Sequence, residues 1–136
     1  MRGRLPSEKS KWYLPQHQYL MALEYALNYD AWMAEIRSLE NQSKAIRYDK
    51  DKVQSSGDYN ATEDAAMEIL ELRNKIERID KAIEEVSGGL DRYIRLAVCY
   101  GFTYTQLTTG RHNMPLNKNE FGEIKHHFYY CLYYLI

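Results

Sequence analysis

The amino-acid sequence predicts an all-α fold, a long antiparallel helical hairpin followed by a three-helix C-terminal unit of helix-turn-helix-like layout. Three observations predict it. Apolar residues recur at steps of three and four along most of the chain, which is the period of a helix with one buried face. Three prolines and seven glycines in 136 residues leave room for long helices. A hydrophobic share of 45% at this length suffices for one core, so we expect a single packed domain.

Residues 1–13 are predicted to form a mobile basic arm, because little in them could be buried. Its charged side chains are Arg2, Arg4, Lys9 and Lys11 against the single acid Glu8. Such an arm can contact phosphate groups, as the arms of several small DNA-binding folds do. A solvated tail is the simpler interpretation.

A long helical hairpin is predicted over residues 14–87. Its first helix begins at Pro15, since proline suits the first helical turn, and extends to about Leu39 or Ser43. Its apolar stripe comprises Leu20, Leu23, Leu27, Met33 or Ala34, Ile36 and Leu39, widened by Tyr19, Tyr25, Tyr29 and Trp32. So wide a stripe predicts contacts on two sides. Its aromatic residues fit either an interface or a core with satisfied hydroxyls.

Residues 44–59 are predicted to connect the two hairpin helices as a solvated loop. Asp49 and Asp51 alternate with lysines there. A metal site on them is disfavoured, because hard cations need more oxygen ligands than two carboxylates provide. A connection this long is more often functional or partly ordered than idle.

The second hairpin helix is predicted over residues 60–87, with Asn60 as N-cap, Glu63 as its reciprocal acid, and Ser87-Gly88-Gly89 as its stop. Its heptad seam consists of Ile69, Leu72, Ile76, Ile79, Ile83 and Val86. A helix of roughly 40 Å requires a partner of similar length. The first helix can supply it as an antiparallel hairpin, or a second copy of the seam can supply it in a homodimer.

Residues 88–136 are predicted to form three helices in series, Asp91–Tyr100, residues 103–109 after the Gly101 break, and residues 117–135. This layout is typical of helix-turn-helix units, whose last helix contacts DNA with its N-terminal end. The candidate nucleic-acid-binding residues are Arg111, Asn117, Lys118, Asn119, Gly122, Lys125 and His126. Asparagine can pair with adenine and lysine can donate to guanine. Alternatively, Asn117 only caps the last helix together with Glu120.

The last helix is predicted to bury Phe121, Ile124, Phe128, Leu132 and Leu135. The tyrosines Tyr129, Tyr130, Tyr133 and Tyr134 flank this face, so the helix is apolar nearly all round. A helix of that kind is central in a fold or belongs to an interface. This favours a protein partner as the alternative to DNA.

The charge distribution gives no global attraction to nucleic acid or to anionic membranes, because the net charge is −1. Residues 111–127 carry three basic and two acidic side chains, 3 − 2 = +1. DNA affinity would therefore be low unless dimerisation or the basic arm contributes.

No apolar run approaches the roughly 20 residues of a membrane span. With no secretory leader and two distant cysteines, we expect a soluble protein of a reducing cytoplasm.

No catalytic or cofactor motif is found, neither a glycine-rich phosphate loop nor a nucleophile motif, so a non-enzyme without cofactor is predicted. His127 and Cys131 lie four residues apart, a spacing that can hold zinc, with His126, His112 and Cys99 as further candidates. No CxxC or HExxH motif accompanies them. A buried cysteine beside surface histidines is therefore favoured over a metal site.

Two sets of residues resemble known proteins. The segment YDKDKVQSS at residues 48–56, followed by a long charged helix and three final helices, resembles small phage and prophage regulators of Gram-positive bacteria, the RinA/ArpU-like and sigma-factor-region-4-like proteins. KWYLPQH at residues 11–17, with MPLNKNEF at 114–121 and FYY at 128–130, resembles uncharacterised phage proteins. The resemblance implies a phage regulator that binds DNA or host transcription machinery such as RNA polymerase through a C-terminal helix-turn-helix.

The alternative function is inhibition of a host defence nuclease by protein binding, as anti-CRISPR proteins do. The middle segment, residues 44–85, carries eight basic and eleven acidic side chains, 8 − 11 = −3, so an acidic surface can act partly as a nucleic-acid mimic.

Overall fold

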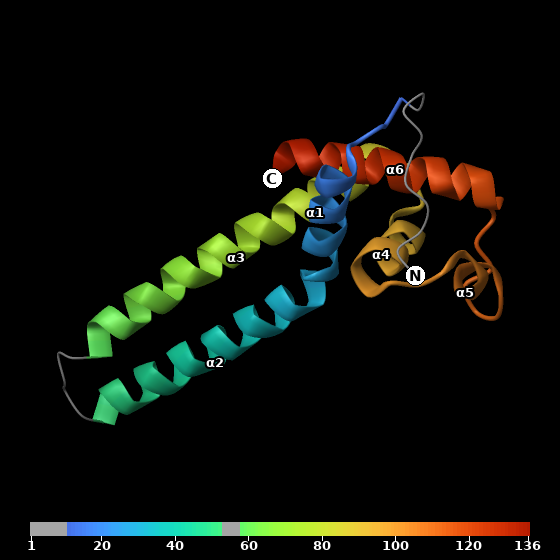
Figure 1. Ribbon diagram of the computed structural model, residues 1–136. Helices are drawn as coiled ribbons and strands as arrows, with labels where there is room; N and C mark the ends of the chain where they lie inside the picture. Colours follow the sequence, from blue (N-terminus) through green and yellow to red (C-terminus); the bar gives the residue numbers. More distant parts are fainter. Residues whose placement is uncertain (1–10, 53–57) are drawn as a thin grey trace. The chain divides into compact units, whose positions relative to one another are not determined.

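The computed structural model describes residues 11–52 and 58–136, and the side chains of 11–42 and 63–136 within them. These residues form six helices and no strand, namely α1 Gln16–Leu27, α2 Tyr29–Lys52, α3 Asp58–Ser87, α4 Asp91–Tyr100, α5 Tyr104–Thr108 and α6 Lys118–Leu135 (Figure 1). The predicted all-α class is confirmed. Arg2, Arg4 and Lys9 of the predicted arm lie outside the described residues, whereas Lys11 is exposed.

The chain divides into two compact units. Met1–Tyr29 and Arg78–Ile136 together form one, here called the terminal unit, and Asp30–Glu77 form the other, here called the middle unit. These boundaries differ from the predicted ones, which separated residues 14–87 from 88–136. The helical segment before Asp30 therefore packs with the C-terminal helices.

The predicted first helix is wrong in its extent, because it is interrupted at Asn28. The Asn28 backbone N–H donates to Tyr25 O and Ala26 O, and its side-chain amide donates to Glu24 O at 2.8 Å. An asparagine side chain that bonds to nearby backbone competes with helix continuation. Two helices, α1 and α2, stand where the sequence predicted one.

The buried face of α1 also differs from the predicted stripe. Its buried residues are Tyr19, Ala22, Leu23 and Ala26, whereas Leu20 is half-buried and Leu27 is 41% exposed. Small side chains such as Ala22 and Ala26 allow a neighbouring helix to approach closely. The contacts of α1 are with α6 and α4.

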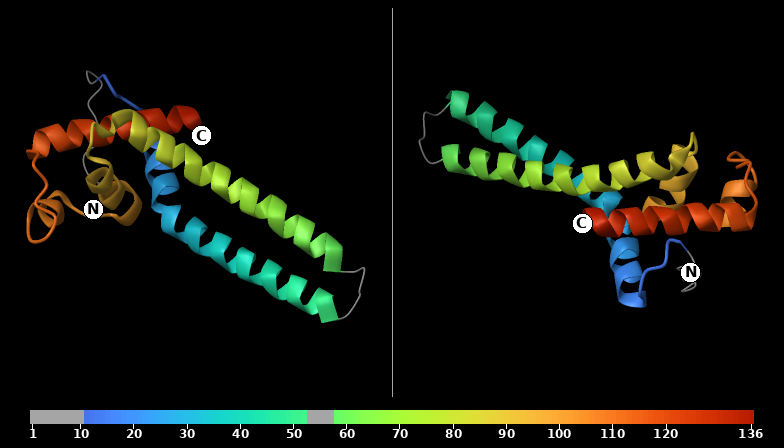
Figure 2. Two further views of the ribbon diagram at one scale, coloured as in Figure 1. Left: turned by 180° about the vertical axis from the view of Figure 1, so that it is seen from behind. Right: turned by 90° about the horizontal axis from the view of Figure 1, so that it is seen from above.

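The core of the terminal unit lies where α6 packs on α1 and where α4 contacts α1, α5 and α6 (Figures 1 and 2). Its fully buried side chains are Leu14, Ile79, Ile83, Ile94, Val98, Leu107, Phe128 and Leu132. Arg95 on α4 holds Asp80 on α3 with an ion pair of 2.7 Å. On α6, Phe121, Phe128 and Leu132 are buried as predicted, but Ile124 is half-buried and Leu135 is 41% exposed.

Tyr129 is buried on α6 although the sequence placed it beside the core. Its ring meets the ring of Tyr19 edge to face, with centroids 5.2 Å apart. Burial raises the pKa of the Tyr129 hydroxyl well above its usual value. Edge-to-face pairs add to the free energy of burial, so the α1–α6 contact is aromatic as well as aliphatic.

In the middle unit, α2 and α3 lie side by side and antiparallel (Figures 1 and 2). Arg73 forms an ion pair with Glu40, and Lys75 Nζ lies 5.4 Å above the ring of Trp32. Ile36 and the seam residues Leu72 and Ile76 are buried. These contacts join α2 and α3 within the middle unit.

The predicted 44–59 loop is wrong, because α2 extends to Lys52 and α3 begins at Asp58. The sequence has no glycine or proline between Asn28 and Gly57, so neither of these helix-breaking residues ends α2 before Lys52. Asn60 lies inside α3 and is not its N-cap. Asp49 and Asp51 lie within α2, and their side chains fall outside the described ones.

The predicted stop of the long helix is confirmed, since α3 ends at Ser87 and is followed by Gly88 and Gly89 with positive φ of 51° and 91°. The three C-terminal helices also lie at the predicted positions. Gly101, at φ 73°, ends α4, and its N–H donates to Ala97 O. Left-handed backbone of this kind favours glycine.

The segment between α5 and α6 covers residues 109–117. Helix-turn-helix units join their two helices with about three or four residues. The helix bounds alone therefore do not establish a helix-turn-helix arrangement.

Candidate functional site

The first candidate surface is the N-terminal end of α6, where Asn117 acts as the N-cap. Asn117 Oδ1 accepts from the Glu120 N–H at 2.8 Å, and the Glu120 carboxylate accepts from the Asn117 N–H at 3.4 Å. The capping interpretation is confirmed. Because the cap already uses Oδ1, pairing of Asn117 with a base edge would compete with it.

Replacing Asn117 with alanine is expected to lower the free energy of unfolding by about 1 kcal/mol, because the cap bond to Glu120 is lost. Urea unfolding followed by circular dichroism measures this change. Asn119→Ala is the matched control, since Asn119 is exposed one position into α6 and does not cap it. Equal stability losses in the two variants would contradict the assignment.

The predicted nucleic-acid-binding residues divide into two groups. Arg111, Asn117, Lys118 and Asn119 are exposed, whereas Gly122, Lys125 and His126 are half-buried. Lys125 Nζ lies 5.9 Å from the ring centre of Phe121, and burial lowers the pKa of this lysine. His126 lies edge to face with Tyr19 at 6.3 Å. Among the predicted residues on α6, those of its first turn are therefore the exposed ones.

The segment that leads into α6 is fixed by three hydrogen bonds to the helices before it. Tyr93 Oη donates to His112 O at 3.1 Å, Tyr104 Oη donates to Leu116 O at 2.7 Å, and the Met114 N–H donates to Leu107 O at 2.9 Å. These bonds hold Lys118 and its neighbours at a defined place on the terminal unit.

Arg92 is a cation that the sequence analysis missed. It is exposed on α4, and its Nη2 lies 3.4 Å from Nδ1 of His112. This contact places Arg92 against the same segment as Arg111. The two residues are separated by 19 positions in the sequence, so no local pattern could have joined them.

The second candidate surface lies on the middle unit. Met67 is 65% and Leu70 is 60% exposed, the highest exposures of large aliphatic side chains among the described residues. With 3.6 residues per turn, both point away from the buried seam residues Leu72 and Ile76. Glu63, Asp64 and Glu71 are exposed beside them. We call Glu63, Asp64, Met67, Leu70 and Glu71 the acidic α3 face.

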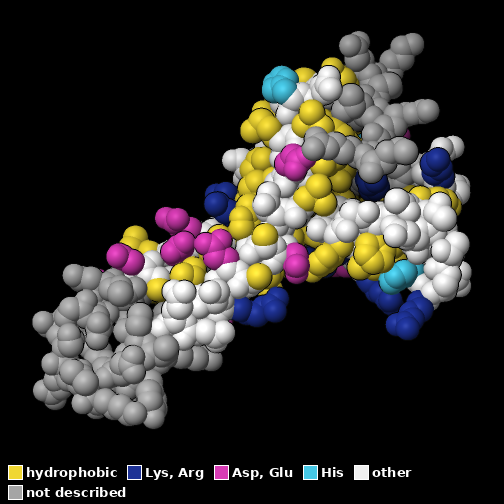
Figure 3. Space-filling model, turned by 60° about the horizontal axis from the view of Figure 1, so that its bottom comes forward, with side chains coloured by type: hydrophobic (Ala, Val, Ile, Leu, Met, Phe, Trp, Pro, Cys, Tyr) yellow, Lys and Arg dark blue, Asp and Glu magenta, His cyan; other side chains and the backbone are white. Residues whose placement is uncertain are grey.

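The charges of this surface are of one sign. The two nearest cations on α3, Arg73 and Lys75, are engaged by Glu40 and by the ring of Trp32. Figure 3 shows acidic side chains gathered beside exposed hydrophobic ones next to the grey residues. The sequence signal for this surface was available, because Met67 and Leu70 are apolar but fall outside the heptad seam.

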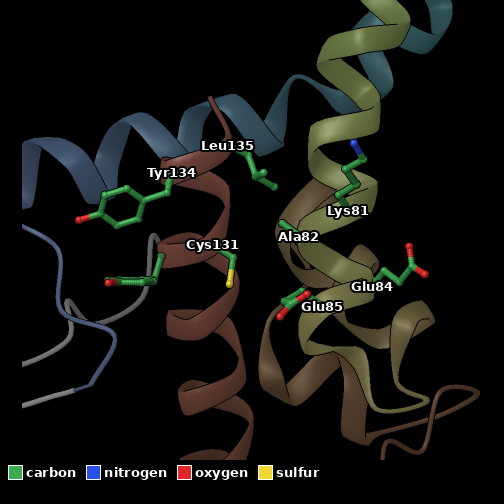
Figure 4. Close-up of a pocket in the computed structure, with 8 residues that line it drawn as sticks. Lys81, Ala82, Glu84, Glu85, Cys131, Tyr134 and Leu135 are labelled. Carbon is green, nitrogen blue, oxygen red and sulfur yellow. The ribbon is translucent and has the colours of Figure 1, made fainter.

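A third candidate is a groove of about 810 Å³ between α3 and α6 within the terminal unit (Figure 4). The groove is lined by Lys81, Ala82, Glu84, Glu85, Tyr130, Cys131, Tyr134 and Leu135. In the close-up, the side chains of Glu85 and Cys131 point toward each other across it. Glu85 was not a predicted site residue, and Cys131 was considered only as a disfavoured zinc ligand.

The predicted dimer seam is mostly buried within the single chain. Its buried members are Leu72, Ile76, Ile79 and Ile83, and its half-buried members are Ile69 and Val86. A homodimer through the whole seam would require the four buried side chains to leave their packing, which makes the intramolecular alternative the economical one.

The His127 ring stacks on Trp12, with centroids 3.7 Å apart and planes within 10°. Burial is the main cause that lowers the pKa of His127 below its usual value. The charge of Glu85 opposes this shift, and the charge of Lys11 adds to it.

Cys99 and Cys131 are free thiols, and no cluster of three potential metal ligands occurs among the described residues.

The His127 pKa shift predicts a pH-dependent stability. A lowered pKa in the folded state favours the neutral ring, so its contribution is present above pH about 6.5 and is lost as the pH falls through the lowered value. We expect the melting temperature to fall less between about pH 7.5 and 5 for His127→Gln than for the wild type. His17→Gln is the control, because His17 is exposed on α1 and should leave the profile unchanged. Identical profiles for wild type and His127→Gln would contradict the assignment.

No protein-family model, curated protein or solved structure matches the chain significantly. Within residues 11–52 and 58–136, no helix has both the length and the apolar character that crossing a bilayer requires.

Proposed function

We propose that this chain is a non-enzymatic protein that acts by binding another protein through the acidic α3 face. The observation that carries the proposal is the pair Met67 and Leu70, both at least 60% exposed on a helix whose opposite side is buried. Large aliphatic side chains gathered on a surface mark interaction sites. Three exposed carboxylates, of Glu63, Asp64 and Glu71, surround them.

The chemistry of the surface defines the partner. Apolar anchors inside a ring of like charges suit an amphipathic helix whose apolar stripe is flanked by lysine or arginine. The carboxylates would accelerate encounter and disfavour acidic partners, while Met67 and Leu70 would supply the buried contact. Methionine adapts to irregular partner surfaces, which suits it to this position.

The resemblance to phage regulators extends the proposal to a class of target. In a phage protein, a basic segment recognised in this way would belong to a host protein that handles nucleic acid, such as RNA polymerase or a defence nuclease. Such proteins carry basic surfaces that bind their nucleic-acid substrates. The carboxylates of the acidic α3 face can bind to such a surface in place of phosphate groups. The protein would act in the bacterial cytoplasm.

The test is a double substitution, Met67→Glu with Leu70→Glu. Both side chains are exposed, so the melting temperature should stay close to that of the wild type. Capture of a host protein from nuclease-treated lysate should fall by about tenfold or more. In the complex, two apolar side chains that the partner would bury are replaced by charged ones. Quantitative mass spectrometry of the captured protein measures this.

Met21→Glu is the matched control, since Met21 is 54% exposed on α1 in the terminal unit. It makes the same chemical change at a similar exposure but away from the acidic α3 face. Capture that survives the double substitution, or that Met21→Glu reduces equally, would refute binding through this face.

DNA is the second candidate partner, favoured by the exposed Arg111, Asn117, Lys118 and Asn119 and by the nearby Arg92. In this case Lys118→Ala should weaken retention on duplex DNA without changing the melting temperature. The slope of the logarithm of the binding constant against the logarithm of the salt concentration should become less steep by about one. Arg37→Ala, at an exposed cation of the middle unit, should have no such effect. A protein that binds only through the acidic α3 face would ignore duplex DNA.

A further inference from the structure

We infer that the groove between α3 and α6 is a docking site for a basic segment of a partner protein, which inserts a lysine or arginine side chain against Glu85. The inference concerns the terminal unit and stands independently of the acidic α3 face. It rests on the lining of the groove, on its charge and on the direction of the Glu85 side chain.

The Glu85 carboxylate provides the charge. Glu85 is exposed on α3 and points into the groove, where it faces Cys131 (Figure 4). Within the described part of the chain, no hydrogen bond or ion pair holds this carboxylate. The negative charge of Glu85 acts on the groove. Burial is the larger cause that raises the pKa of the Cys131 thiol, and the Glu85 charge raises it further.

The opposite wall provides the surface for the aliphatic stem of a basic side chain. Tyr130 and Tyr134 line it on α6, with ring centroids 4.9 Å apart, and Leu135 follows. The stems of lysine and arginine pack on apolar surface. In the close-up, Leu135 points from α6 toward α3, where Ala82 lies, whereas the Tyr134 ring points away from α3 (Figure 4). Leu135 and Ala82 therefore supply apolar surface beside the Glu85 carboxylate, which matches the stem and the charge of a cationic side chain.

The size of the groove favours a peptide segment over a single small amine. A volume of about 810 Å³ exceeds what one side chain fills, and Lys81 and Glu84 lie at its edge, so flanking residues of the partner would also be in contact. Glu84 points away from the groove in the close-up, and it is available to a second cation of the same segment. The occupant is thus an extended or helical stretch with at least one basic and several apolar residues.

Cys131 gives the groove a reporter. Its Sγ points into the groove, and it is half-buried. The other thiol, Cys99, is 3% exposed, and burial raises its pKa to about 12. Thiol reagents applied to the native protein will therefore modify Cys131, and Cys131→Ser will abolish the signal.

The first measurement compares two methanethiosulfonate reagents, one carrying a trimethylammonium group and one carrying a sulfonate group. We expect Cys131 to react about tenfold faster with the cation, because Glu85 concentrates cations in the groove. The ratio of the two rates cancels any change in the thiolate fraction. Glu85→Gln should reduce this ratio severalfold, whereas Glu123→Gln, at an exposed acid on α6 outside the groove, should leave it unchanged.

The second measurement tests the peptide. A nine-residue peptide of alternating lysine and leucine should slow modification of Cys131 by neutral N-ethylmaleimide, and its glutamate-for-lysine counterpart should not. Protection should disappear in Glu85→Gln. An unchanged reagent ratio in Glu85→Gln, or equal protection by the two peptides, would overturn the inference.

A last variant distinguishes two possible occupants of the groove, a segment of a partner protein and the chain's own basic residues. Arg2→Gln, Arg4→Gln and Lys9→Gln are combined in the full-length chain. If the lysine peptide protects Cys131 only in this triple variant, the occupant is the chain's own basic segment and the assignment to a partner protein fails. Equal protection in the wild type and the triple variant supports the partner.

Discussion

Replacing Phe128 with alanine is expected to lower the free energy of unfolding by about 3–5 kcal/mol. Phe128 is fully buried at the centre of α6, in the helix that packs on both α1 and α4. Its ring contacts Tyr129 edge to face at 5.2 Å, and the truncation leaves a cavity that neighbouring helices fill only in part. Chemical unfolding followed by circular dichroism measures the change. Because domains are stable by only about 5–15 kcal/mol, the variant should be close to unfolding at 37 °C.

Tyr134→Ala provides the matched aromatic control on the same helix. Tyr134 is 66% exposed, so its loss should change the free energy of unfolding by less than about 0.5 kcal/mol. A loss of less than about 1 kcal/mol for Phe128→Ala would mean that α6 does not form the core of the terminal unit.

Enlarging Ala26 to leucine is the second change with a large expected effect, a loss of about 1–3 kcal/mol. Ala26 has no exposed surface, and it lies on the side of α1 that is buried with Ala22. Three added carbon atoms have no space there, so α1 must move away from its neighbours or adopt a strained rotamer. Thermal unfolding should show a melting temperature lower by several degrees.

Leu27→Ala tests the same helix at the position next to Ala26. The sequence predicted Leu27 in the core, but the structure leaves it 41% exposed, so truncation should cost little. The two variants together decide the rotation of α1 about its axis. A costly Leu27→Ala with a tolerated Ala26→Leu would restore the stripe that the sequence predicted and refute the observed packing.

The C-terminal helices could be predicted because their signals are local. Gly101 at a positive φ and the Asn117–Glu120 box each act within a few residues of the helix end that they define. The structure adds a second box, Thr103 with Gln106, which the sequence analysis did not use. Such signals depend on backbone donors and acceptors near the helix end and need no tertiary context. The end of α3 at Ser87 belongs to the same class.

The errors occurred where a local signal competed with a longer-range effect. Asn60 was predicted as an N-cap, but α3 begins at Asp58. Asn28 separates α1 from α2, although no break was predicted there. An asparagine can be a cap, a break or an ordinary helical residue. Packing of the flanking helices decides among these, because the intrinsic preferences differ by only about 1 kcal/mol.

The candidate surfaces follow the same division. Lys118 and its neighbours were predicted from a helix start, and they are exposed. Met67 and Leu70 were visible as apolar residues outside the seam, but only their exposed fractions identified them as a surface. Glu85 and Cys131 are far apart in the sequence, and no pattern in either helix indicated that they face each other.

The sequence by itself determined the helical class, the three C-terminal helices and the stop at Ser87, since periodicity and capping act over one or two turns. The tertiary structure decided that residues before Asp30 join the C-terminal helices, that Ala26 rather than Leu27 is buried, and that α3 and α6 enclose a groove. These features depend on which apolar surfaces meet. Burial free energy is proportional to area and has no direction, so the sequence specifies that a surface must be covered without specifying by what.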